Sequence, residues 1–210
     1  MTKAKADLRS PHQSCRFDLN GDHHAHKRFP ERLAFLLDNP IRRWLSPPER
    51  LISKLKIGPG DVVVDFGCGP GFYLIPLARI AGKTIGIDAS SRMLERAAKQ
   101  AKKAMATVEV IQSDGTDIKL PDNCVDLILL VHVFHEVESK ATVLKEFRRI
   151  LESEGRLAVV EKTHRDRLSP KAFNPPTVSE KEVVREIQEG GFRLQHVILM
   201  GKDSIFMCAR

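Results

Sequence analysis

The stretch Val62-Val-Val-Asp-Phe-Gly-Cys-Gly-Pro-Gly71 places the tightest constraint on how this chain can fold. Its three β-branched valines predict a buried strand. Three glycines follow at alternate positions, and the apolar run 72–81 then predicts a helix. Glycine allows positive φ and close approach of the backbone, and the first turn of a helix offers unpaired N–H groups. A strand, a glycine turn and a helix in this order therefore predict a site for a nucleotide-like ligand.

The spacing of the glycines distinguishes between ligands. A dinucleotide fold requires Gly-x-Gly-x-x-Gly, whereas this chain has Asp65-x-Gly67-x-Gly69-x-Gly71. This pattern resembles motif I of the class I S-adenosylmethionine (SAM)-dependent methyltransferases. The resemblance implies that Asp65 helps to hold the amine of SAM, often through water. A carboxylate suits an ammonium group better than a pyrophosphate. A tight turn that holds no ligand is the alternative.

Composition limits the remaining possibilities. The chain has 210 residues, of which 42% are hydrophobic, so we expect one domain with a substantial core. The net charge of +7 allows an acidic partner, but 29% charged residues of both signs also describe an ordinary surface. The four cysteines lie far apart without a Cys-x-x-Cys pair, and residues 1–10 carry no signal-peptide pattern. We therefore expect a reduced, cytoplasmic protein without a membrane span.

Strands and helices alternate after the glycine turn. We expect strands at 84–88, 107–111, 124–131 and 156–160, and helices after Ser90, at 139–151 and at 179–190. Met93, Leu94, Ala97 and Ala101 form the apolar face of the first of these helices, and Ser179 and Glu182 predict a capping box for the last. Segments 192–199 and 204–209 predict a closing β-hairpin. The fold class is α/β, a Rossmann-like methyltransferase sandwich with a mostly parallel seven-stranded sheet and a C-terminal antiparallel hairpin.

Three segments are expected along the chain. Residues 1–29 form a polar, flexible tail, residues 30–57 form N-terminal helices, and residues 58–210 form the SAM-binding domain. The tail contains Cys15 and four of the eight histidines, His12, His23, His24 and His26, whose spacing matches no standard zinc module. A solvated tail is favoured over a metal site. The helices of 30–57, the second capped by Ser46, either cover the ligand site as a lid or pack on the sheet edge.

Two further acids follow predicted strands. Asp88 ends the second strand, where a carboxylate can accept hydrogen bonds from both ribose hydroxyls of a nucleoside. The resemblance implies that Asp114 accepts from the adenine amino group and that the N–H of Gly115 meets the ring. The alternatives are a surface acid at position 88 and a plain Asp-Gly turn at position 114.

The fourth strand leads into Val131-His-Val-Phe-His-Glu-Val137. Ligands of open α/β sheets bind beyond the carboxyl ends of the strands, so Val131 and His132 should border the methionine part of SAM. His135 and Glu136 are the candidates for a general base or for orienting the substrate. In the alternative, both histidines are structural and no base is needed. The polar segment 161–177 either selects the substrate or is a plain connector.

The resemblance extends over residues 26–210, to bacterial and archaeal methyltransferases of the ubiquinone/menaquinone-methyltransferase-like type. His26-Lys-Arg-Phe, Leu37-Asp-Asn-Pro-Ile-Arg-Arg43, Pro47-Pro-Glu49 and His135-Glu136 carry it outside motif I. It implies SAM as the cofactor, an unidentified methyl acceptor, expected to be a small molecule, and no metal. The implied cofactor-binding residues are Asp65, Gly67, Cys68, Gly69, Gly71, Tyr73, Asp88, Ala89, Met93, Asp114, Gly115, Val131 and His132. An NAD(P)-binding oxidoreductase and a basic module that binds RNA are the alternatives, and neither is favoured.

Overall fold

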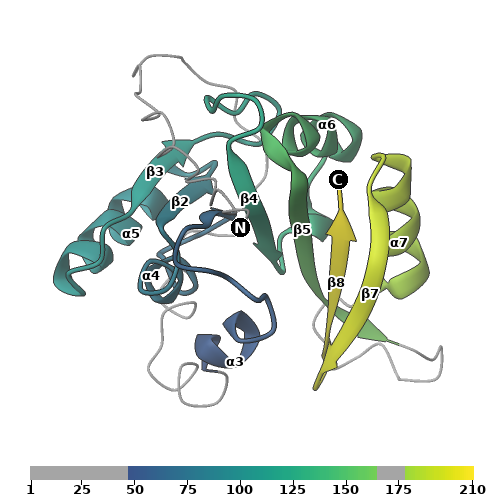
Figure 1. The fold of residues 1–210 in the computed structure, drawn as a ribbon, viewed down its shortest axis with the longest axis horizontal. Coiled ribbons are helices and arrows are strands. Elements are labelled where there is room, and N and C mark those ends of the chain that lie inside the picture. The colour runs from purple at the N-terminus through teal and green to yellow at the C-terminus, as the bar shows by residue number, and fades with distance from the viewer. Residues whose placement is uncertain (1–46, 165–177) are drawn as a thin grey trace, which may run out of the picture.

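The computed structural model describes residues 47–164 and 178–210. Its centre is one twisted sheet (Figure 1). The strands are β1 (Val62–Phe66), β2 (Lys83–Asp88), β3 (Glu109–Gln112), β4 (Val125–Val131), β5 (Leu151–His164), β6 (Val178–Ser179), β7 (Arg193–Met200) and β8 (Asp203–Ala209). They lie in the order β3-β2-β1-β4-β5-β8-β7, and β6 pairs with the end of β5.

Neighbouring strands from β3 to β5 run parallel, whereas β8 is antiparallel to both β5 and β7. The prediction of a mostly parallel sheet with an antiparallel C-terminal hairpin is confirmed. With the hairpin strands β7 and β8, seven strands lie side by side in one sheet. The two-residue β6, which pairs only with β5 among the described strands, is the eighth. Because β1 to β4 are parallel, their carboxyl ends meet at one edge of the sheet, which is where the chemistry of open α/β folds gathers.

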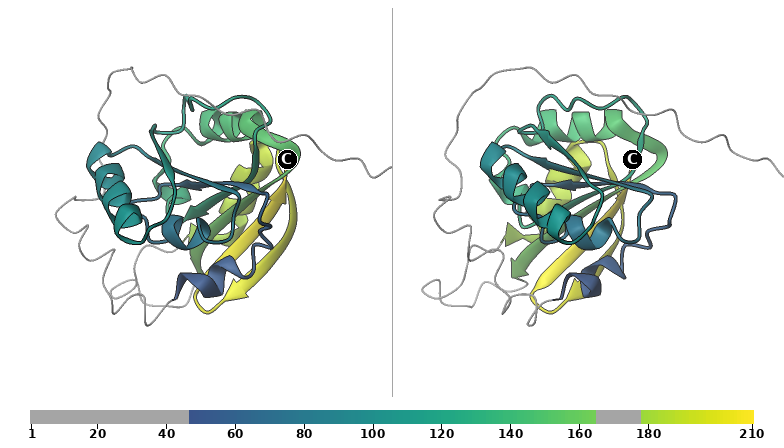
Figure 2. Two further views of the ribbon diagram at one scale, coloured as in Figure 1. Left: turned by 60° about the vertical axis from the view of Figure 1, so that its left-hand side comes forward. Right: turned by 90° about the vertical axis from the view of Figure 1, so that its left-hand side faces the viewer.

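Helices cover both faces of the sheet (Figure 2). On one face, α6 (Lys140–Ile150) and α7 (Glu180–Glu189) bury Phe147 and Ile187 against Val64 and Ile128. On the other lie α3 (Pro48–Ile52), α4 (Leu74–Leu77) and α5 (Ser91–Lys103). Strands buried on both faces explain the continuous apolar runs of β1 and β4. Among residues 47–164 and 178–210, no helix combines the length and apolarity needed to cross a membrane.

The cap of α5 forms as predicted. The Ser90 hydroxyl accepts a hydrogen bond from the N–H of Met93 at 3.4 Å. The predicted apolar face of this helix is buried, including Leu94 and Ala97. The positive ends of the Lys102 and Lys103 side chains lie in the last turn, where they complement the helix dipole.

Several element ends differ from the prediction. The run 72–81 contains only the four-residue α4, which includes Pro76, and α3 ends at Ile52. The predicted capping box at the start of α7 is wrong, because Ser179 makes no side-chain cap bond. Ser179 instead belongs to β6, where it pairs with β5. Strand β5 begins at Leu151 rather than at residue 156 and extends to His164.

Candidate active site

The turn after β1 has the backbone that its glycines predict. Gly67, Gly69 and Gly71 all adopt positive φ, at 71°, 52° and 95°. The N–H of Gly67 donates to the carbonyl of Ile87 at the end of β2, which ties the turn to the neighbouring strand. A Cβ added at Gly67 would lie 2.5 Å from Val133 Cγ2, whereas one at Gly69 would meet no atom within 4 Å. The turn therefore packs against the segment after β4 at its start and faces open space in its middle.

Asp65 lies beneath this turn with an unsatisfied carboxylate. The residue is 2% exposed, and its Oδ2 finds no hydrogen-bond partner within the described residues. Burial raises the pKa of Asp65 to about 7, and the nearby negative charge of Asp88 adds to the rise, while the N–H of Leu74 opposes it. A buried, unpaired carboxylate oxygen destabilises the fold. An ammonium group bound at this position would supply both the missing donor and the missing charge.

Asp88 ends β2 and organises the same turn. Its Oδ2 accepts from the N–H of Gly69 at 2.9 Å, and its Oδ1 accepts from the N–H of Ser90 at 2.8 Å. A carboxylate offers about four acceptor positions, so these two bonds are compatible with further contacts to ribose hydroxyls. The side chain thus joins the glycine turn to the start of α5. Asp65 and Asp88 thus place two carboxyl groups at this end of the sheet.

Other predicted cofactor residues surround the same end of the sheet. Ala89 follows β2 directly, and Met93 lies in the first turn of α5. Tyr73 is half-buried and packs edge-to-face on Phe72, with ring centroids 5.0 Å apart. Cys68 is buried in the turn, and burial, followed by the charges of Asp65 and Asp88, raises the pKa of its thiol. The thiol therefore stays protonated, so Cys68 has the properties of a packing residue and not those of a nucleophile.

Asp114 and Gly115 follow β3, as predicted, and form a compact local turn. Asp114 Oδ1 accepts from the N–H and the hydroxyl of Thr116, at 2.9 and 2.7 Å. The N–H of Gly115 donates to Ser113 Oγ at 3.0 Å, and Gly115 has a φ of 92°. Asp114 thus shapes an Asp-Gly turn, which is the predicted alternative to a base-binding role. Its contact with adenine stays a prediction.

Two histidines follow β4, and each pairs with a carboxylate from a distant part of the chain. His132 has a φ of 57°, and its Nε2 lies 3.0 Å from Asp203 Oδ1 at the start of β8. His135 lies in the short helix η2 (Phe134–Glu136), with its Nδ1 3.0 and 3.1 Å from the two oxygens of Glu161. Glu136 is exposed, and its Oε1 lies 3.8 Å from His135 Nε2.

Sequence reasoning missed Asp203 and Glu161 as partners of the histidines. The sequence predicts that Glu161 starts a polar segment, whereas the structure makes it a strand residue that is 2% exposed. The sequence does offer one signal for Glu161. This acid directly follows the apolar run Leu157-Ala-Val-Val160, so it can belong to the same buried strand. Asp203 was placed in the hairpin turn, and nothing in the local sequence relates it to residue 132, 71 positions away.

Some predictions fall outside the described residues. These are the tail 1–29 with its histidines and Cys15, the first predicted helix of 30–57, the Ser46 cap of the second, and residues 165–177 of the polar segment. Within residues 47–164 and 178–210, no group of three or more His, Cys, Asp or Glu side chains is arranged to hold a metal.

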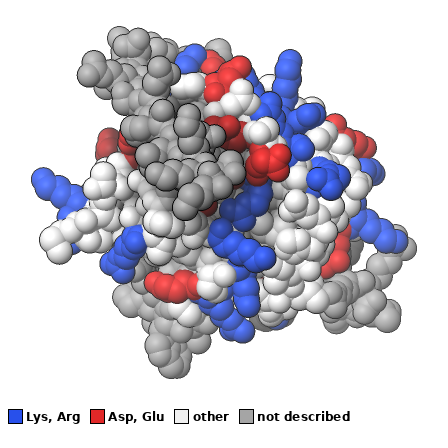
Figure 3. Space-filling model, viewed as in Figure 1, with Lys and Arg blue, Asp and Glu red and all other residues white. Residues whose placement is uncertain are grey.

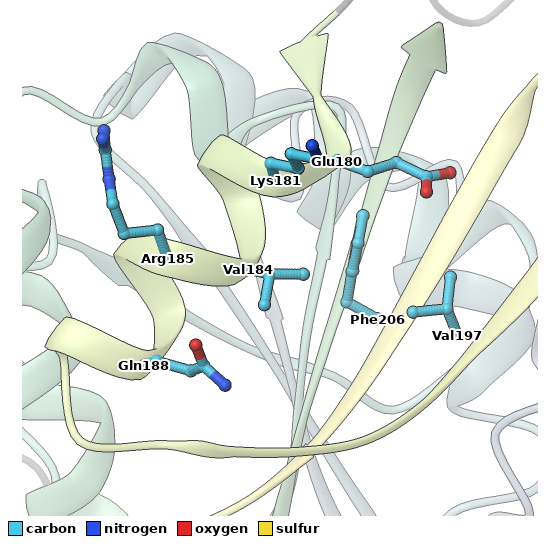
Figure 4. A pocket seen from close by; sticks show the side chains of 7 residues that line it. All are labelled: Glu180, Lys181, Val184, Arg185, Gln188, Val197 and Phe206. Carbon is cyan, nitrogen blue, oxygen red and sulfur yellow. The ribbon is translucent and has the colours of Figure 1, made fainter. Parts of the chain in front are cut away.

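A surface hollow lies elsewhere in the molecule, between α7 and the strands β7 and β8 (Figure 4). It has a volume of about 310 Å³ and is lined by Glu180, Lys181, Val184, Arg185, Gln188, Val197 and Phe206. Strands β4 and β5 lie between β1 and the strands that line it. The hollow therefore belongs to the far edge of the sheet and not to the glycine turn.

Comparisons with known proteins agree with this geometry. Residues 64–159 match the family described as "Methyltransferase domain". A SAM-dependent methyltransferase structure from Aquifex aeolicus superposes with a TM-score of 0.77 at 29% identity, over 86% of this chain and 98% of that one. A protein of Methanococcus maripaludis, titled a putative SAM-dependent methyltransferase, gives 0.70 at 25% identity, over 90% and 97%.

A curated relative, demethylmenaquinone methyltransferase of Lactobacillus johnsonii, is 30% identical over 118 residues. That match covers 54% of this chain and 48% of the relative, so the chain spans at most about half the length of such relatives. The order of strands, the glycine turn with its two acids and these matches all lead to one assignment. Residues 64–159 thus match a methyltransferase domain, and the described fold is that of SAM-dependent methyltransferases, a family whose cofactor is S-adenosylmethionine.

Proposed function

We propose that this protein transfers the methyl group of SAM to a small-molecule acceptor. The observation that carries the proposal is Asp65, a buried carboxylate with an unpaired oxygen beneath a turn of three positive-φ glycines. The residues at the site fit the cofactor for two reasons. The ammonium group of SAM can donate a hydrogen bond to the unpaired Oδ2 of Asp65, and the open space at Gly69 admits a ligand next to the backbone.

The cofactor would be held by residues from four strand ends. Asp65 takes the ammonium group and Asp88 the ribose hydroxyls. Asp114 and Gly115 take the adenine, and Val131 and His132 border the methionine chain. Gly67, Cys68, Gly69, Gly71, Tyr73, Ala89 and Met93 complete the walls.

SAM supplies a methyl group on a positively charged sulfur, which is the reactive part of the chemistry. The chain must then orient the acceptor and exclude water. Of the two roles weighed for residues 30–57, the described part fits packing on the sheet, because Leu51 and Leu55 are buried in the core. We propose that residues 165–177, which lie outside the described residues, select the acceptor. His135 and Glu136 are the proposed catalytic residues, since they lie in the segment that packs on Gly67 through Val133.

The acceptor is best sought among small aromatic molecules. The name of the Lactobacillus johnsonii relative supports including demethylmenaquinone, in which the methyl would go to a ring carbon, as the carbon-acceptor alternative to test. The buried Cys68 and Cys208 are free thiols, which supports a reducing compartment and hence the cytoplasm.

Isothermal titration calorimetry with SAM and with S-adenosylhomocysteine tests the proposal. We expect saturable binding of both ligands with one site per chain, and no binding of NADH, because the glycine spacing does not suit a pyrophosphate. Failure of SAM and S-adenosylhomocysteine to bind at millimolar concentration would contradict the proposed function.

A further inference from the structure

Glu161, near the end of β5, is a buried carboxylate whose side-chain hydrogen bonds within the described residues all go to His135. It is 2% exposed, and its oxygens accept from the backbone N–H of His135 at 3.2 Å and meet His135 Nδ1 at 3.0 and 3.1 Å. A buried charge is costly unless it is paired and hydrogen-bonded. The strand therefore keeps a charged side chain in its core to hold the ring and the backbone of His135.

This contact fixes which nitrogen of His135 carries the proton. An ionised carboxylate only accepts hydrogen bonds, so the Nδ1 that faces Glu161 must be the N–H nitrogen. In the neutral ring, Nε2 then has a lone pair. This nitrogen lies on the side of the exposed Glu136, 3.8 Å from its Oε1. The contact with Glu161 thus leaves Nε2 as the proton-accepting nitrogen, and Glu136 can stabilise the ring after it has gained a proton.

The second histidine of the loop is used differently. His132 has its Nε2 3.0 Å from Asp203 Oδ1, so this nitrogen is engaged by a strand of the C-terminal hairpin. Of the two rings, His135 is the one whose Nδ1 is held by a buried carboxylate. Its helix η2 follows Val133, which packs on Gly67 of the glycine turn. The imidazole is therefore held at the end of the sheet where the cofactor site is proposed.

We infer that Glu161 is a positioning residue that holds His135 as the base for a hydroxyl acceptor, a phenol or an enol. This inference rests on the proposed function and names the acceptor class. In the step, the acceptor oxygen forms a bond to the methyl carbon while the methyl–sulfur bond breaks. Its hydroxyl proton passes to His135 Nε2. The products are a methyl ether, neutral S-adenosylhomocysteine and an imidazolium that returns its proton to solvent.

The chemistry of the acceptor explains why a held base indicates a hydroxyl group. A phenol keeps its proton near neutral pH and becomes a good nucleophile only as that proton leaves, which a general base accelerates typically 10²- to 10⁴-fold. An aromatic thiol is already ionised at neutral pH and gains nothing from a base. The pair 2-naphthol and 2-naphthalenethiol differs only in this atom, so it isolates the contribution of the base.

The first test is the tautomer of His135, read from ¹⁵N NMR of the imidazole side chains and assigned by the signals lost in His135→Gln. We expect the Nδ1–H form in the wild-type protein and its loss in Glu161→Leu, which fills the same space without an acceptor. Glu146→Gln is the matched control, because Glu146 also accepts from a backbone N–H and a basic side chain, those of Ile118 and Arg149. An Nε2–H form in the wild type, or no change in Glu161→Leu, would overturn the inference.

The second test is kinetic. We expect Glu161→Leu to lower kcat for 2-naphthol about 100-fold, while kcat for 2-naphthalenethiol changes less than about threefold and the SAM affinity is kept. Equal loss on both acceptors would show a structural role. Turnover of the thiol alone, or of neither acceptor, by a wild-type protein that binds SAM would refute the hydroxyl class. Failure of the wild type to bind SAM would refute the proposed function instead, and the tautomer result would stand separately.

Discussion

Asp65 shows how an unfavourable burial can indicate a binding site. Its carboxylate is buried, its Oδ2 lacks a partner within the described residues, and its pKa is raised to about 7 by burial and by Asp88. In the folded protein without ligand, the group keeps its proton up to pH values at which an unfolded aspartate has lost it. Asp65 therefore contributes less to stability as pH rises from about 4 to about 7, by an amount on the order of 4 kcal/mol in total.

Binding of SAM should reverse this preference, because the ammonium group favours the ionised carboxylate. We expect SAM affinity to rise with pH between about 5 and 7, by up to about tenfold per pH unit, and to level off above pH 7. Calorimetry over this pH range measures it. The control ligand is methylthioadenosine, which has no ammonium group and should show a flat profile. Asp65→Asn should also flatten the profile for SAM, and a pH dependence that survives this substitution would assign it to another group.

Asp88 should contribute to affinity in two ways, through the ribose and through the bonds that hold Gly69 and Ser90. We expect Asp88→Ala to weaken SAM binding at least tenfold, equivalent to about 1.4 kcal/mol or more. Asp117→Ala is the matched control, since it removes an exposed acid that bonds Lys119. Retained affinity in Asp88→Ala would remove Asp88 from the site.

At the scale of elements, the sequence predicts the features that follow from local patterns and misses those that depend on contacts between distant residues. Strand and helix order, the buried runs of β1 and β4, the cap of α5 and the hairpin follow from local patterns. The capping box of Ser179 failed because that residue pairs with β5. Glu161 was missed because its partner His135 lies 26 residues away, and local sequence carries no information on which distant side chain meets a buried acid.

The glycine turn and the segment after β4 are joined at Gly67, where φ is 71° and an added Cβ would lie 2.5 Å from Val133 Cγ2. We expect Gly67→Ala to lower the free energy of unfolding by about 2–4 kcal/mol, from backbone strain and overpacking together. Gly69→Ala is the matched control, since its φ is 52° but its Cβ would meet nothing within 4 Å. It should cost only about 1–2 kcal/mol. Urea denaturation measures both, and adding Val133→Ala should recover part of the loss at Gly67 alone.

At the scale of the molecule, the excess positive charge does not belong to the described fold. Residues 1–46 carry a net charge of +4 and residues 165–177 carry +2, which leaves +1 for residues 47–164 and 178–210. On the face drawn in Figure 3, basic and acidic side chains are interspersed. The described domain therefore offers little support for a basic module that binds RNA.

A ligand that binds the folded state alone stabilises the whole domain, so the proposed cofactor should be visible in thermal unfolding. At a SAM concentration 100 times its dissociation constant, the gain is about 2.7 kcal/mol. A domain of this size gains roughly 2–4 °C in Tm per kcal/mol, so we expect a rise of about 5–10 °C. NADH at the same concentration should give none, and Asp88→Ala should require at least tenfold more SAM for the same rise. A rise with NADH that equals the rise with SAM would show that the glycine turn accepts a pyrophosphate after all, despite the carboxylate of Asp65 beneath it.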